Sequence, residues 1–242
     1  MTDRILFIIP AYNEEKNISK PVNDIRANFE GADIIVVNDC SKDNTLKVLQ
    51  ELKVDYLNHQ INLGYSGAVQ TGIKYAKLND YDYVIQFDGD GQHLASEAHK
   101  LYDTMKESGV NIVMGSRFLE KTDYKHSFFR RMGTSFFTFL IKLITGKRIT
   151  DPTSGLQMLD RKTIDRYSQP GQYPEFPDAN LVAKMIIDGY SVEEVSCLMA
   201  ERTDGVSMHA GIIKPIKYVI KNVYSLLIIG ITKMFRRKSK YV

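Results

Sequence analysis

The sequence contains no tryptophan and only two cysteines, Cys40 and Cys197, among its 242 residues. Two cysteines so far apart make no disulfide framework, and no Cys/His spacing typical of a zinc site occurs, which favours a reduced cytosolic protein. The net charge of +3 is too small to indicate a nucleic-acid partner. The apolar run close to Met1 is too short for a signal peptide. We therefore expect a cytosolic protein that binds no nucleic acid.

The hydrophobic pattern predicts one domain over residues 1–210, followed by an amphipathic basic helix and tail over residues 211–242. Within the domain, short apolar runs rich in β-branched residues occur at 5–9, 34–37, 83–87 and 112–114. Such runs are typical of strands buried on both faces of a parallel sheet. Helical patterns alternate with them, for example Ile18, Val22, Ile25 and Phe29. The alternation predicts an α/β fold with a doubly wound, mostly parallel sheet flanked by helices.

The tract VIQFDGDGQH, residues 84–93, runs from an apolar strand pattern into two carboxylates. Alternate side chains of an extended segment point the same way, so Asp88 and Asp90 can converge on one cation. Carboxylate oxygens suit Mg²⁺ or Mn²⁺, and magnesium is usually held together with substrate phosphates. A calcium loop of the EF-hand type is excluded, because its required Gly and Glu positions hold His93 and His99. A polar turn is the structural alternative.

Polar clusters follow three of the predicted strands. They are PAYNEE at residues 10–15, NDCS at 38–41, and the pair Asp88 and Asp90. Ligands of doubly wound sheets bind beyond the carboxyl ends of the strands. The clusters therefore predict one ligand site at this edge of the sheet.

In combination, several segments resemble the family 2 glycosyltransferases, whose fold is the GT-A type. These segments are IPAYNEEKNI, VVNDCSKDNT, NLGYSGAVQTGI, FDGDGQH, GSRF, DPTSGLQML and ERTDGVSMH. The resemblance implies nucleotide contacts from Ala11, Tyr12, Glu14 and Asp39. It also implies metal–diphosphate binding at Asp88 and Asp90, with Gln92 nearby.

Asp39 has a physical reason to read the base. A buried carboxylate can accept a hydrogen bond from a pyrimidine ring N–H, which selects uracil-like bases over cytosine. The alternative is a helix N-cap, although Ser41 and Asp43 are better placed to cap the helix that follows.

A sugar hydroxyl acceptor would need a general base within hydrogen-bond reach. Glu175 and Asp178 precede a helical pattern in YPEFPDANLVAKMI, where inverting members of the family look to place such a base. Asp178 is the first choice and Glu175 the second. The alternative for Asp178 is an N-cap on that helix.

Members of the family that use polyprenyl phosphate look to have arginines at places similar to Arg117, Arg130, Arg131 and Arg202. A guanidinium can bind a phosphate through two hydrogen bonds. Together with nearby phenylalanines, these arginines favour a lipid-phosphate entrance. The phenylalanines are Phe128, Phe129, Phe136, Phe137 and Phe139. Solvated surface arginines are the alternative.

The C-terminal stretch combines lysines with an apolar face that includes Ile216, Val219, Ile220, Val223, Leu227 and Ile231. No charge falls between Lys221 and Lys233, a gap shorter than the ~20 apolar residues that a membrane-spanning helix needs. We therefore expect this segment to lie on a membrane surface. The alternative is a helix packed on the core with a solvated basic end.

The sequence thus favours an inverting glycosyltransferase that uses Mg²⁺ or Mn²⁺ and a nucleoside diphosphate sugar of the UDP or GDP type. The expected acceptor is polyprenyl phosphate or a lipid-linked saccharide, in cell-surface glycan assembly at the inner face of the cell membrane. A nucleotidyltransferase or a phosphatase using the same metal pair is one alternative. A non-catalytic nucleotide-sugar-binding subunit is another.

Overall fold

The computed structural model describes residues 3–120, 128–200 and 213–238, leaving out the side chains of residues 128–130, 213–217 and 236–238. Seven strands form one sheet in the order β3-β2-β1-β4-β6-β5-β7. The strands are β1 (Ile5–Ala11), β2 (Asp33–Asn38), β3 (Asp55–Asn58), β4 (Tyr83–Gln86), β5 (Ile112–Ser116), β6 (Gln157–Asp160) and β7 (Val192–Ser196). All pairs are parallel except those that β6 makes with β4 and β5. The predicted mostly parallel α/β sheet is confirmed.

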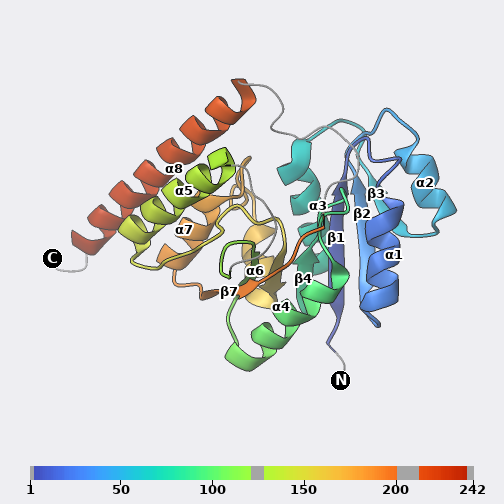
Figure 1. Cartoon of the computed structure of the whole chain (residues 1–242), viewed down its shortest axis with the longest axis horizontal. Coiled ribbons are helices and arrows are strands. Elements are labelled where there is room, and N and C mark those ends of the chain that lie inside the picture. Colours follow the sequence, from blue (N-terminus) through green and yellow to red (C-terminus); the bar gives the residue numbers. More distant parts are fainter. Residues whose placement is uncertain (1–2, 121–127, 201–212, 239–242) are drawn as a thin grey trace.

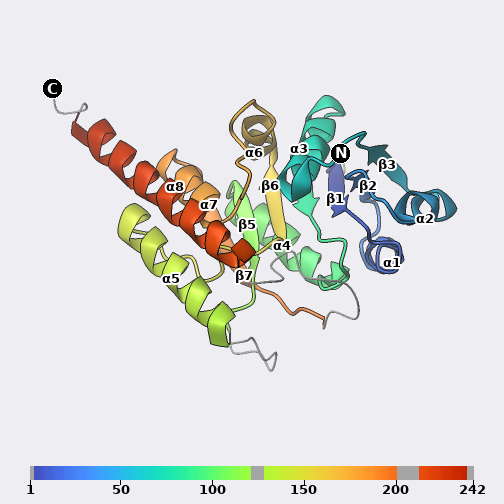
Figure 2. The same cartoon turned by 90° about the horizontal axis from the view of Figure 1, so that it is seen from above.

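Helices cover both faces of the sheet, because successive side chains of its strands point to opposite sides. In β1, Leu6 and Ile8 pack in one apolar cluster, and Phe7 and Ile9 pack in the other. Figure 2 shows α3 and α6 on one side of the sheet and α1 and α4 on the other. The helices are α1 (Ser19–Asn28), α2 (Thr45–Glu51), α3 (Gly64–Leu78), α4 (Ala95–Ser108), α5 (Phe128–Thr145), α6 (Arg161–Tyr167), α7 (Ala179–Ile187) and α8 (Ile213–Lys238).

Strand β6 departs from the expected alternation. It follows α5 and enters the sheet from the edge at which β4 and β5 end, so it runs antiparallel to both. The residues just before β6 therefore lie beside the residues just after β4 and β5. This geometry brings the DPTSG segment, residues 151–155, to the predicted ligand edge.

Helices α5, α7 and α8 gather at one end of the sheet, and the C-terminal end of α8 projects beyond the others (Figure 1). The stretch Tyr218–Phe235 of α8 has a mean hydropathy of 1.3 and is long and apolar enough to cross a membrane by length and composition. The uncharged stretch between Lys221 and Lys233, by contrast, is shorter than the ~20 apolar residues that a membrane-spanning helix needs. Length alone therefore does not separate a spanning helix from one that lies at the surface. The expected domain boundary at residues 210 and 211 lies outside the described residues.

Candidate active site

The predicted nucleotide-contact residues at the end of β1 and in the loop after it are bonded to the start of α2. The backbone N–H of Glu14 donates to Thr45 Oγ1 at 2.8 Å, and the Glu14 carboxylate accepts from Asn17 Nδ2 at 2.7 Å. Ala11 is buried at the end of β1, whereas Tyr12 is 42% exposed. Since β1 and β2 are parallel neighbours, their carboxyl ends meet at one edge. The structure thus holds these residues in one surface region beside Asp39.

Asp39 is buried, and its carboxylate accepts from the start of α3. Oδ1 accepts from the N–H of Leu63 at 2.8 Å and lies 2.8 Å from Nδ1 of His59. Oδ2 accepts from the N–H of Gly64 at 2.7 Å, where a φ of +79° favours glycine. Asp39 therefore satisfies backbone donors of α3, a helix remote in sequence, and not those of the helix that follows it. Its role in reading a base stays a prediction.

The carboxylate of Asp88, just after β4, is held on both oxygens. Oδ1 accepts from the Tyr65 hydroxyl at 3.0 Å, and Oδ2 lies 3.0 Å from Nε2 of His93. Burial raises the pKa of Asp88, but the hydrogen bonds from His93 and Tyr65 outweigh burial and lower the pKa overall. Asp90 Oδ1 accepts from the N–H of Gln92 at 3.1 Å. Asp88 and Asp90 both keep solvent-accessible surface.

The donor set around Asp88 suits a cation that also binds a substrate phosphate. Among the residues that the structure describes, no group of three or more His, Cys, Asp or Glu side chains could hold a metal ion. Two partly exposed carboxylates, one of them with a lowered pKa, are the protein share that Mg²⁺ commonly takes when phosphates complete its shell. The residues therefore fit Mg²⁺ or Mn²⁺ bound together with a diphosphate.

Gly155 lies directly against Asp88. In the antiparallel ladder Gln86 is opposite Gln157, and continuing this register by two residues places Gly155 opposite Asp88. A Cβ atom added to Gly155 would lie 2.6 Å from Oδ2 of Asp88, closer than Cβ atoms approach in proteins. Any side chain at this position would displace the carboxylate, so the site requires glycine here.

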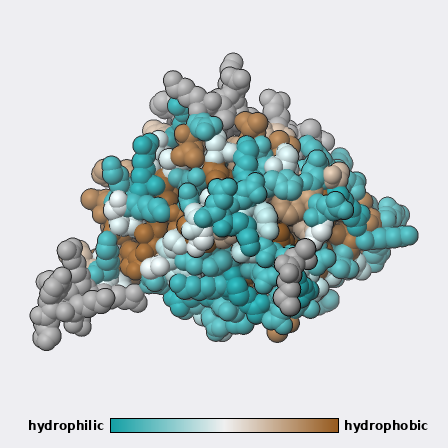
Figure 3. Space-filling view, turned by 90° about the horizontal axis from the view of Figure 1, so that it is seen from below, coloured by the Kyte–Doolittle hydropathy of each residue, from teal (hydrophilic) through white to brown (hydrophobic). Residues whose placement is uncertain are grey.

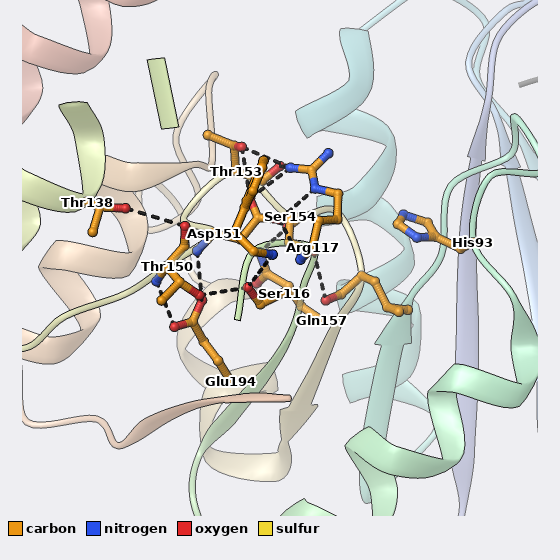
Figure 4. Close-up of polar contacts among 12 residues, drawn as sticks. His93, Ser116, Arg117, Thr138, Thr150, Asp151, Thr153, Ser154, Gln157 and Glu194 are labelled. Carbon is orange, nitrogen blue, oxygen red and sulfur yellow. Dashed lines mark hydrogen bonds and ion pairs between the residues drawn. The ribbon is translucent and has the colours of Figure 1, made fainter. Parts of the chain in front are cut away.

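Arg117, just after β5, is engaged by a buried carboxylate (Figure 4). Its Nε lies 2.6 Å from Asp151 Oδ2, and its Nη2 lies 2.8 Å from Asp151 Oδ1. Thr153 Oγ1 accepts from the same Nη2 at 3.1 Å. The guanidinium was predicted to bind a lipid phosphate. The structure shows that Asp151 fixes its orientation, and its positive charge favours the ionised forms of Asp88 and Asp178.

Asp178 occupies the N-cap position of α7, but its side chain makes no capping hydrogen bond. Asn180 Oδ1 accepts from the N–H of Leu181 at 2.8 Å instead. The capping alternative for Asp178 is therefore wrong. The pKa of Asp178 is raised to about 6. Burial raises it most, the charge of Asp88 also raises it, and a hydrogen bond from Tyr218 opposes both.

Glu175, the second choice for a base, lies on the surface. Its side chain is 71% exposed, and Oε2 accepts from Lys221 Nζ of α8 at 2.7 Å. Lys221 also lies over the ring of Phe176, 4.9 Å from its centroid. Glu175 therefore joins the segment before α7 to α8, whereas the Asp178 carboxyl is close enough to Asp88 for the charge of Asp88 to raise its pKa.

The predicted lipid-phosphate entrance is described only in part. Arg131 is exposed on α5, whereas the side chain of Arg130 and the whole of Arg202 lie outside the described residues. The side chains of Phe128 and Phe129 are also outside them. Phe137 packs in the core, and Phe136 and Phe139 are exposed.

Several site residues carry contacts that the sequence did not predict. Tyr65, His93 and Asp151 lie inside segments already recognised by resemblance, NLGYSGAVQTGI, FDGDGQH and DPTSGLQML. Their position within these segments was the only sequence signal that they belong to the site. Glu194, which bonds to the loop before β6, lies in none of the recognised segments.

Comparison with known proteins agrees with this geometry. Residues 6–168 match the model of glycosyl transferase family 2. A UDP-N-acetylglucosamine–dolichyl-phosphate N-acetylglucosaminyltransferase of Methanococcus voltae is 32% identical over 206 residues, covering 76% of this chain and 82% of that protein. A polyprenol monophosphomannose synthase of Mycolicibacterium smegmatis is 27% identical over 223 residues, covering 87% of this chain and 82% of that protein.

Solved structures also show the same fold. Glucosyl-3-phosphoglycerate synthase from Mycobacterium tuberculosis, in complex with Mn²⁺, UDP-glucose and phosphoglyceric acid, matches with a TM-score of 0.69 at 15% identity. The match covers 94% of this chain and 80% of that chain. At this identity the likeness concerns the fold, which is of the GT-A type.

Removing the Asp151 carboxylate should lower the stability of the folded protein. Asp151→Ala removes the carboxylate that forms an ion pair with the buried Arg117 guanidinium, so we expect a loss of about 3–5 kcal/mol in the free energy of unfolding, measured by urea denaturation. Glu51→Ala, which breaks the exposed pair with Lys47, is the control and should cost less than about 0.5 kcal/mol. Equal losses in the two variants would contradict this account of the Arg117 pair.

Proposed function

Because this chain belongs to glycosyl transferase family 2 and is a glycosyltransferase, we propose that it transfers a sugar, with inversion, from a nucleoside diphosphate sugar to polyprenyl phosphate. The proposal includes a divalent cation at Asp88 and Asp90 and a place at the cytosolic face of the membrane. A lipid-linked saccharide is the alternative acceptor. Family membership sets aside the nucleotidyltransferase, the phosphatase and the non-catalytic subunit.

One observation carries the donor half of this proposal. Asp88 and Asp90 follow β4 at the carboxyl edge of the sheet, beside the loops after β1 and β2, where doubly wound folds bind nucleotides. A fold neighbour was solved with Mn²⁺ and UDP-glucose. The acceptor half is supported by relatives named for dolichyl phosphate and polyprenol monophosphomannose.

On the donor side, Asp39 would accept a hydrogen bond from the base, and Tyr12 offers an exposed ring beside it. Asp88 and Asp90 would hold Mg²⁺ or Mn²⁺. When bound, such a cation supplies positive charge that neutralises a departing diphosphate. Tyr65 and His93 keep the Asp88 carboxylate in one orientation, which limits the rearrangement needed when the donor binds.

On the acceptor side, a phosphate oxygen would attack the anomeric carbon from the face opposite the nucleotide. One C–O bond forms as the bond to the nucleoside diphosphate breaks, so the configuration inverts. A lipid phosphate is already anionic at neutral pH and needs no base, whereas a sugar hydroxyl must lose a proton to Asp178. The cationic Arg117, fixed by Asp151, would favour an incoming phosphate.

Helices α5 and α8 present an exposed apolar surface, which we call the lipid face. Its members are Met132, Phe136, Phe139 and Leu143 of α5, and Val219, Ile220, Tyr224, Leu227, Ile228, Ile231, Met234 and Phe235 of α8. Figure 3 shows apolar side chains in brown at this end of the molecule, at the left of the view. Neither helix contains an acidic residue. An apolar surface on two helices whose charged residues are all basic suits an anionic lipid bilayer.

The contacts of α8 favour a position in the plane of the interface. Asn222 and Leu226 are buried against the domain. Val223, which the sequence predicts on the membrane-facing side of the helix, packs on the core instead. Lys221 bonds to Glu175, in the segment that precedes α7. Because protein covers one side of α8 and apolar side chains cover the other, we propose that α8 lies at the membrane surface. The alternative of a core-packed helix accounts for only one of its two sides.

The metal pair can be tested by isosteric substitution. Asp88→Asn and Asp90→Asn each remove one charge, so transfer from the sugar nucleotide should fall by about 10²-fold or more. Titration calorimetry should show loss of the Mn²⁺-dependent part of UDP or GDP affinity. Asp103→Asn, on the exposed side of α4, is the matched control and should change neither. Full activity in both site variants would refute the metal role.

The acceptor class can be tested at Asp178. With a saccharide acceptor, Asp178→Asn should lower the rate by about 10²-fold, because a base is lost. The wild-type rate should also fall as pH drops through about 6, since the raised pKa leaves Asp178 protonated below that value. With polyprenyl phosphate the effect of Asp178→Asn should be small, because the phosphate needs no base. A large loss on polyprenyl phosphate would contradict the phosphate mechanism.

The lipid face can be tested by vesicle co-sedimentation. Leu227→Gln combined with Ile231→Gln should weaken binding to anionic vesicles about 10-fold or more, because both side chains are over half exposed on α8. Binding of the wild type should weaken at high salt. Leu78→Gln is the control, since Leu78 is an exposed leucine on α3. Unchanged sedimentation of the double variant would exclude the lipid face.

A further inference from the structure

Glu194, in β7, accepts three hydrogen bonds from the loop that precedes β6 (Figure 4). Oε2 accepts from the N–H of Thr150 at 2.7 Å. Oε1 accepts from the Thr150 hydroxyl at 3.0 Å and from the N–H of Asp151 at 2.8 Å. The parallel pairing of β7 with β5 sets Met114 opposite Glu194. Glu194 lies beyond residues 6–168, the part of the chain that matches the family model.

The loop that Glu194 holds is also tied to the turn after β5. Ser116 Oγ and Thr150 Oγ1 are 2.7 Å apart, and the N–H of Phe118 donates to Ser116 Oγ at 3.2 Å. The next residue of the loop, Asp151, binds Arg117 through two hydrogen bonds. One partly buried network therefore fixes the position of the Arg117 guanidinium and the start of the loop together.

The far end of the same loop reaches the metal pair. Gly155 follows Asp151 by four residues, and its Cα faces Asp88. A Cβ atom added to Gly155 would lie 2.6 Å from Oδ2 of Asp88. Such a close approach leaves little room, so a small displacement of the loop would change the space available to the Asp88 carboxylate. The loop thus connects Glu194 to a residue proposed to hold the cation.

We propose that Glu194 is a positioning residue for the transfer reaction. It holds the loop of residues 150–155 in place. Gly155 then allows the Asp88 carboxylate to keep its cation-binding orientation, and Asp151 keeps its ion pair with Arg117. Glu194 acts through the loop and touches neither donor nor acceptor. This inference rests on the proposed function, because the orientation of Asp88 matters only if Asp88 binds a cation.

Glu194→Gln tests the role with little change in shape. A glutamate offers acceptors on both oxygens, whereas a glutamine amide turns one of them into a donor. In one orientation the new amide donor would face the N–H of Thr150, and in the other it would face the N–H of Asp151 and the Thr150 hydroxyl. In both orientations a donor faces a backbone donor. The loop must then move away from β7. Glu193→Gln is the matched control, because Glu193 is the neighbouring residue of β7 and its side chain is exposed.

The experiment measures Mn²⁺ affinity by calorimetry in the presence of UDP or GDP, together with kcat and the KM values for donor and acceptor. Glu194→Gln should weaken Mn²⁺ affinity about 10-fold and lower kcat about 10-fold or more, while Glu193→Gln matches the wild type. If Glu194→Gln does not fold, Thr150→Val, which removes only the hydroxyl bonds to Glu194 and Ser116, should show the same pattern more weakly.

The outcomes separate this inference from the proposed function. Wild-type Mn²⁺ affinity and kcat in a folded Glu194→Gln, or in Thr150→Val where the former does not fold, would overturn the role of Glu194 alone. A wild-type chain that binds Mn²⁺ with nucleotide but adds no sugar to polyprenyl phosphate would overturn the acceptor proposal and leave the Mn²⁺ test of Glu194 valid. A wild-type chain that binds no Mn²⁺ would overturn both.

Discussion

The direction of β6 is the constraint on which the site depends. Because β6 runs against β4, the loop that leads into it lies at the edge where β4 ends, and Gly155 comes to face Asp88. The same loop carries Asp151, whose buried carboxylate holds the guanidinium of Arg117. A parallel β6 would start at the opposite edge, and neither contact would form. Asp88, Arg117 and the loop of residues 150–155 are thus brought together by the direction of one strand rather than by neighbouring positions in the sequence.

The sequence predicted the elements that repeat with a regular period. The buried runs became β1, β2, β4 and β5, and the polar clusters after the first three lie at one edge, because parallel strands end together. Strand β6 has only two apolar residues between Gln157 and Asp160 and was not predicted, and no local signal gives its direction. The partners of Asp39 and Asp88 were equally invisible, since Leu63 and Tyr65 lie more than twenty residues away along the chain. Hydrogen bonds over such distances are set by packing.

The C-terminal part of the chain adds α7, β7 and α8 to the region that the family model matches. Strand β7 supplies Glu194 to the loop that ends beside Asp88, and α8 lies along α5 and α7. The amphipathic pattern of α8 was visible in the sequence, but which side packs was not. Val223 faces the core, whereas Leu227 and Ile231 remain exposed. Since α8 also bonds to Glu175, three residues before Asp178, the exposed apolar surface adjoins the segment that carries Asp178.

The central claim is that the chain moves a sugar from a nucleoside diphosphate to a lipid phosphate. The most direct measurement is mass spectrometry of the lipid product after incubation with polyprenyl phosphate, Mn²⁺ and a panel of UDP and GDP sugars, with NMR of the anomeric proton. The account predicts a lipid that gains one sugar from one of these donors, with inverted configuration, and no product when the metal is chelated. A retained anomeric configuration, a product formed equally well under chelation, or no adduct with any donor would contradict it.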